Sequence, residues 1–63
     1  MAEFKILKGT NDKPVLVNTQ NISCVQQDSK NTSKVFFTGD PNDYIIVEGT
    51  LEEVTFTLTG KRI

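Results

Sequence analysis

Five short apolar runs, separated by turn-forming residues, set the tightest limit on what this chain can fold into. Hydrophobic residues make up 37% of the sequence and are concentrated in Val, Ile and Phe, with eight Thr beside them. β-branched and aromatic residues favour pleated, half-buried surfaces over helices. The runs occupy residues 4–7, 15–17, 22–27, 35–37 and 44–47. The sequence therefore predicts a mainly β fold, either a five-stranded antiparallel meander sheet or a small open barrel.

The polar segments between the runs have the chemistry of turns. Segment 9–14 begins with Gly and ends with Pro14, which cannot donate to a strand ladder. Segment 28–33 is polar throughout and predicts a six-residue loop. Segment 39–43 contains Gly, Asp, Pro and Asn and is the strongest turn signal in the chain. No linker or repeat divides the sequence, so we expect one domain over residues 1–63.

The stretch after the fifth run has two interpretations. Thr50 and Glu53 have the spacing of a capping box, and Gly60 is placed to end a helix. One helical stripe would then carry the apolar residues Leu51, Val54 and Leu58. Against this, residues 54–59 alternate with period two and are half threonine, which favours a sixth strand. The agreement of start and stop signals favours a short C-terminal helix, with a sixth strand at 54–59 as the alternative.

The chain is short enough to need reinforcement. A domain of about 60 residues buries only about 60% of the surface that its unfolded chain exposes. Cys24 is the lone cysteine and the sequence has no His, so neither an intrachain disulfide nor a Cys/His zinc site is expected. We expect Cys24 to be an inert, buried strand residue. Self-association is the remaining reinforcement.

Charge and residue inventory exclude several function classes. The net charge is −1, with Lys and Arg scattered along the chain, so no footprint for nucleic acid or an anionic membrane is expected. Residues 1–8 do not resemble a signal peptide, which predicts a cytoplasmic protein. The absence of His removes the usual base for a Ser or Cys nucleophile, and the carboxylates are typical of turn and helix-cap residues. We predict no enzymatic activity, no cofactor and no metal.

Three stretches resemble small bacterial domains. The series "LVNTQNISCVQQD", "SKVFFTG" and "YIIVEGTLEEV" resembles the flagellar FlbD family over about 40 of the 63 residues. It is also similar to the first half of LytTR-type domains. The FlbD resemblance implies a motility-operon association without an established chemistry, and the LytTR resemblance lacks the half that carries much of the DNA contact surface. The longer 28–33 loop and the extra segment 55–63 depart from FlbD, so a phage or mobile-element protein of similar build is an equal alternative to a flagellar one.

The apolar residues of the predicted strands point to both faces. Val35 and Phe37 oppose Phe36, and Ile45 opposes its neighbours Tyr44 and Ile46. A sheet that is apolar on both sides must be covered on both sides, and one short helix covers only part of one. We therefore predict an oligomeric interaction module that binds itself, as a homodimer or higher homo-oligomer, and another protein as a further partner. The predicted contact residues are Phe36, Ile45 and Phe56. The alternative function is a small nucleic-acid-binding regulator.

Overall fold

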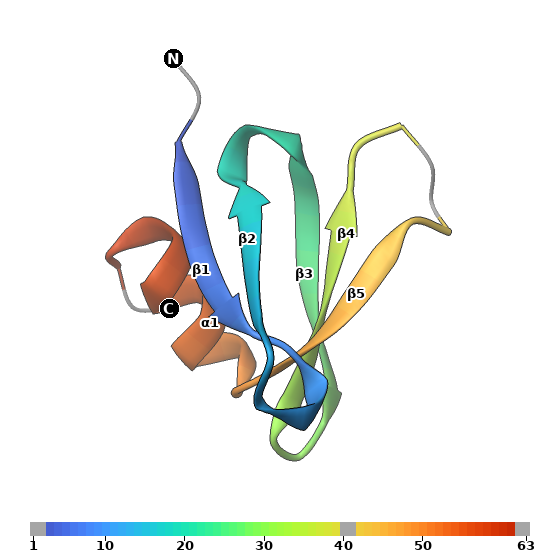
Figure 1. The fold of residues 1–63 in the computed structure, drawn as a ribbon, viewed down its shortest axis with the longest axis vertical. Coiled ribbons are helices and arrows are strands. Elements are labelled where there is room, and N and C mark those ends of the chain that lie inside the picture. The colour runs from blue at the N-terminus through green and yellow to red at the C-terminus, as the bar shows by residue number, and fades with distance from the viewer. Residues whose placement is uncertain (1–2, 40–41, 62–63) are drawn as a thin grey trace.

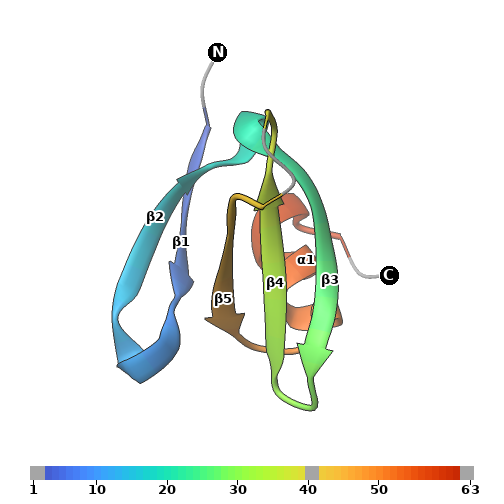
Figure 2. The ribbon, with the colours of Figure 1, turned by 90° about the vertical axis from the view of Figure 1, so that its right-hand side faces the viewer.

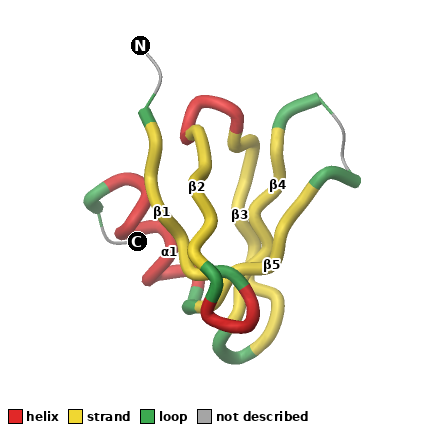
Figure 3. Tube along the Cα trace, in the orientation of Figure 1, coloured by secondary structure: helices red, strands yellow, loops and turns green. Residues whose placement is uncertain are grey.

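The computed structural model describes residues 3–39 and 42–61 and contains five strands followed by one helix (Figures 1 and 3). Short 3₁₀ turns precede β2 and β3. Asp40 and Pro41, in the turn predicted at 39–43, lie outside the described residues. The elements are β1 (Phe4–Lys8), β2 (Pro14–Asn18), β3 (Ile22–Ser29), β4 (Thr32–Phe37), β5 (Tyr44–Glu48) and α1 (Leu51–Thr59).

The strands form two antiparallel sheets, β1-β2 and β3-β4-β5. Figure 2 shows them as separate layers, with β1 and β2 on one side and β3 to β5 on the other. Among the described residues, an isolated bridge between Gly9 and Val47 is the one strand pairing that joins them. The predicted mainly β fold is confirmed, but its five strands are divided between two sheets. The chain passes from one sheet to the other after β2. There the Asn18 side chain accepts a hydrogen bond from the Gln20 amide and caps a 3₁₀ turn that redirects the chain.

The helix follows its sequence signals. The Thr50 hydroxyl accepts from the Glu53 amide at 3.2 Å, and the Glu53 carboxylate accepts from the Thr50 amide at 2.9 Å. Gly60 ends the helix with φ of 76°, in the left-handed region that glycine adopts without strain. The predicted helix is confirmed, and the alternative of a sixth strand at 54–59 is wrong. Two cap hydrogen bonds and a buried Val54 outweigh the strand preference of its threonines.

Segment 28–33, which was predicted to be a loop, instead forms the tip of a tight hairpin between β3 and β4. β3 extends to Ser29 and β4 begins at Thr32, which leaves a two-residue turn. The Thr32 hydroxyl donates to the Asp28 carboxylate at 3.1 Å, and the Gln27 amide donates to main-chain carbonyls around the turn. Polar side chains here form hydrogen bonds within the turn. The chain therefore makes a tight hairpin instead of an open loop.

The core lies between the inner faces of the two sheets and α1. Its buried apolar residues are one leucine and four valines: Leu7, Val17, Val35, Val47 and Val54. Ser33 is the one buried polar side chain of the described residues, and its hydroxyl donates to the Gly49 carbonyl at 2.9 Å. Helix α1 lies beside β1 in Figure 1 and also packs against β3 and β4, so it closes the core between the two sheets.

Candidate interaction surfaces

The outer face of the β1-β2 hairpin carries three exposed apolar side chains. Ile6 and Leu16 lie directly opposite each other in the antiparallel register, and each is 65% exposed. Phe4 lies two residues along β1 from Ile6, on the same face, and is 55% exposed. These three residues form the hairpin patch.

The position of Gly9 explains why the hairpin patch faces outward. Gly9 is buried, and a Cβ on it would lie only 2.9 Å from Val15 Cγ2 and 3.0 Å from the Lys13 carbonyl oxygen. The close approach lies within the hairpin, and it is the bridge to Val47 that places the Gly9 side of β1 toward the three-stranded sheet and the core. Strand residues alternate between the two faces. Leu7, two residues before Gly9, therefore points toward the core, and Ile6 points to the outer face. The hairpin patch was not among the predicted contact residues, and strand alternation, with the bridge at Gly9 marking the inner face, is the signal that locates it.

The outer face of the three-stranded sheet carries a second apolar surface. Phe36 and Tyr44 are directly opposite each other, with ring centroids 5.3 Å apart and planes tilted by 42°. The Lys34 ammonium lies 5.1 Å from the centroid of the Tyr44 ring, within cation–π range. Ile46 lies beside Lys34 on the same face. Phe36, Tyr44 and Ile46 form the sheet patch.

Cys24 is exposed, so the prediction that it is buried is wrong. A β-bulge at Ser23 is the cause: Ile22 pairs with Phe37, but Cys24 already pairs with Phe36. The extra residue shifts the alternation by one position, so that Ile22 and Val25 both pack toward the core. Cys24 is thereby turned onto the outer face, at the edge of the sheet patch.

The three predicted contact residues lie on three different surfaces. Phe36 belongs to the sheet patch. Ile45 lies on the inner face, where it packs partly buried against the core. Phe56 is 50% exposed on α1 and points away from the side that buries Val54. The structure therefore does not bring these residues together, and their role in contacts stays a prediction.

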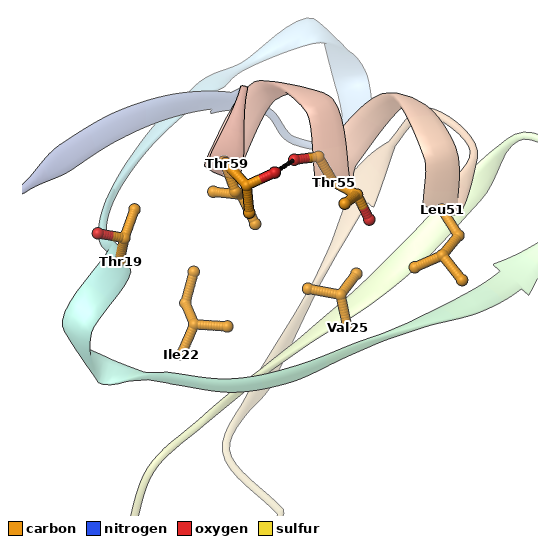
Figure 4. A pocket seen from close by; sticks show the side chains of 7 residues that line it. Thr19, Ile22, Val25, Leu51, Thr55 and Thr59 are labelled. Atoms are coloured by element: carbon orange, nitrogen blue, oxygen red, sulfur yellow. Dashed lines mark hydrogen bonds between the residues drawn. The ribbon is translucent and has the colours of Figure 1, made fainter. Parts of the chain in front are cut away.

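A groove runs between α1 and β3 (Figure 4). Ile22 and Val25 point from β3 toward the helix, and Leu51 points from α1 into the same space. The volume of the groove is about 340 Å³, and its lining has no charged residue. The remaining lining residues are Thr19, Thr55, Leu58 and Thr59.

Charged groups are interleaved rather than segregated. The Lys8 ammonium lies 3.1 Å from the Asp12 carboxylate, and this hydrogen bond and charge lower the pKa of Asp12 and raise the pKa of Lys8. Lys34 likewise lies 3.8 Å from Asp28. Over residues 3–39 and 42–61, no group of three His, Cys, Asp or Glu side chains is arranged to hold a metal ion.

Within the described part of the chain, no helix has both the length and the apolar character needed to span a membrane. Comparisons with protein-family models, with curated proteins and with solved structures give no significant match. None of them bears on the resemblance to the FlbD family or to LytTR-type domains, which stays a prediction.

Proposed function

We propose that this protein is a small interaction module, without catalytic activity, that associates with itself and with another protein through apolar surfaces. The observation that carries the proposal is the hairpin patch, whose three large side chains are each more than half exposed. The core, in contrast, is built of one leucine and four valines. A chain that buries its smaller apolar residues and exposes larger ones gains further stability when another surface covers them.

The expected gain is large compared with the stability of so small a domain. Complete burial of one Leu, Ile or Phe side chain contributes about 1.5–3 kcal/mol. A domain of this length has a free energy of unfolding of about 3–9 kcal/mol at typical values per residue. Covering even part of the hairpin patch or the sheet patch therefore changes the stability measurably. An identical subunit is the commonest cover, and the two-fold dimer is the commonest symmetry.

Light scattering and sedimentation velocity test the proposal directly. We expect a mass of two or more chains at tens of micromolar, and a melting temperature that rises with protein concentration, because dissociation is coupled to unfolding. A 7.0 kDa monomer whose melting temperature is the same at all concentrations would contradict self-association.

One observation favours nucleic-acid binding as a second candidate function. Phe36 and Tyr44, with Lys34 beside them, have the composition of a small base-stacking platform. The net charge of −1 and the pairing of Lys34 with Asp28 weaken this candidate, because affinity for a phosphate backbone comes mainly from unneutralised cations. We expect no gel shift of a generic single-stranded oligonucleotide at about 150 mM salt. A submicromolar shift that is lost in Tyr44→Ala would establish the second candidate instead.

A further inference from the structure

Within the described residues, strand β3 has one edge that pairs with no other strand. Strand β3 pairs with β4 on one side, and Figure 2 shows it at the margin of its sheet with β4 as its neighbour. At eight residues it is the longest strand of the described chain. Edge strands are usually protected by proline, lysine or bulges. Residues 22–29 contain no Pro, Lys or Arg, and the two bulges of β3 leave a regular run at 24–27 between them.

The groove between α1 and β3 lies along the inner side of this free edge. The Leu51 amide donates to the Gln27 side chain at 2.7 Å, which holds the start of α1 against β3. A strand added to β3 would project alternate side chains into the groove, against Val25 and the helix. Because the lining is uncharged, the added strand must present apolar or small polar side chains on that side. β3 itself presents Ile22 and Val25 there.

We infer that two copies of the chain pair through their β3 edges, antiparallel and centred on Val25. The two α1 helices cover this pairing, which we call the β3 joint. This inference rests on the proposed self-association and names its surface. Opposite residues in an antiparallel pair must share a face, so Val25 meets Val25 of the second copy under the helices, and Cys24 meets Gln26 on the outer face. The two Asp28 carboxylates lie at opposite ends of the pairing, so no like charges are opposed.

The small size of the β3 joint determines which contacts must supply most of the interface. A regular edge of four residues, 24–27, covers only a small area, whereas specific interfaces usually bury more than about 1,000 Å². The groove lining must therefore supply most of the contact, through Leu51, Thr55 and Leu58 of both helices. The pairing extends each three-stranded sheet to a sheet of six and leaves the hairpin patch and sheet patch exposed for a partner protein.

Two threonines on α1 provide a matched test. Thr55 lines the groove, whereas Thr57 lies on the side of the helix toward Ile6. A lysine at 55 would be buried without a partner charge, so Thr55→Lys should weaken dimerisation at least about tenfold in sedimentation velocity. Thr57→Lys should dimerise like the wild type. Circular dichroism shows whether each variant is folded.

A crosslink tests the register independently of the charge variants. Directly opposed strand residues have the Cα separation that a disulfide needs. Gln26→Cys, which keeps the native Cys24, should therefore give a covalent dimer under mild oxidation. The double variant Cys24→Ser, Gln26→Cys, which has no opposing thiol, should not.

The outcomes separate this inference from the proposed function. A dimer that is unaffected by Thr55→Lys, is not crosslinked by Gln26→Cys and is lost in Leu16→Lys would overturn the β3 joint and place self-association at the hairpin patch. A monomer at every concentration would overturn the proposed function itself. Loss of the dimer in Thr55→Lys but not in Thr57→Lys, together with a crosslink in Gln26→Cys that requires the native Cys24, supports the β3 joint.

Discussion

A thiol reagent should label Cys24 in the native protein at nearly the rate measured in denaturant. The side chain is exposed on the outer face of β3, opposite Phe36, and needs no opening of the fold to react. A buried cysteine, in contrast, reacts only from the small population of open molecules, which slows labelling by orders of magnitude. The measurement is the second-order rate constant at a dilution that keeps the chain monomeric.

The same measurement has a clear negative result. A native rate many times slower than the denatured rate would place Cys24 on the inner face. The bulge at Ser23 would then be absent, and the register of β3 on β4 would differ from the one described. A rate that falls as protein concentration rises is the expected behaviour of the β3 joint, because Cys24 lies beside it.

Val47→Ala should remove a large share of the free energy of unfolding. Val47 is fully buried, pairs with Ser33 in one sheet and forms the bridge to Gly9 of the other. Loss of two methyl groups at this junction, with a cavity that neither sheet can close, should cost about 2 kcal/mol. The measurement is urea unfolding at fixed protein concentration.

Ile46→Ala is the matched control for this substitution. Ile46 is the adjacent residue on β5, points to the outer face and is only partly buried. Ile46→Ala removes more atoms than Val47→Ala. It should nevertheless lower the free energy of unfolding by less, at most about 1 kcal/mol, because water already reaches part of the Ile46 side chain. Equal or reversed losses would show that the core does not lie where Val47 places it.

The elements with local signals could be predicted from the sequence. The helix at 51–59 follows from a capping box and a terminal glycine, each of which acts within a few residues. The five strands follow from apolar runs between turn residues. Their division into two sheets does not, because it depends on how the 3₁₀ turn after β2 orients the β1-β2 hairpin and the three-stranded sheet toward a shared core.

The amino-acid sequence alone does not show which side chains of these strands face outward. One extra residue at Ser23 reverses the direction of Cys24, and bulges have no reliable local sequence signature. In β1, the bridge from Gly9 to Val47 of the other sheet marks the inner face, on which Leu7 is buried while Ile6 is exposed. Phe36 and Ile45 were chosen from strand positions and Phe56 from the exposed side of the helix, and the three lie on separate surfaces. The polar hairpin at 28–33 was missed because its hydrogen bonds come from side chains such as Gln27.

Over residues 3–39 and 42–61 one bridge pairs the two sheets, which makes the cohesion of this domain sensitive to temperature. Within each sheet the strands are held by a ladder of main-chain hydrogen bonds, but across the Gly9–Val47 junction the sheets are held mainly by buried valines. Attraction between apolar groups weakens on cooling. Cold should therefore weaken the packing of the β1-β2 hairpin on the three-stranded sheet more than it weakens the ladders within each sheet.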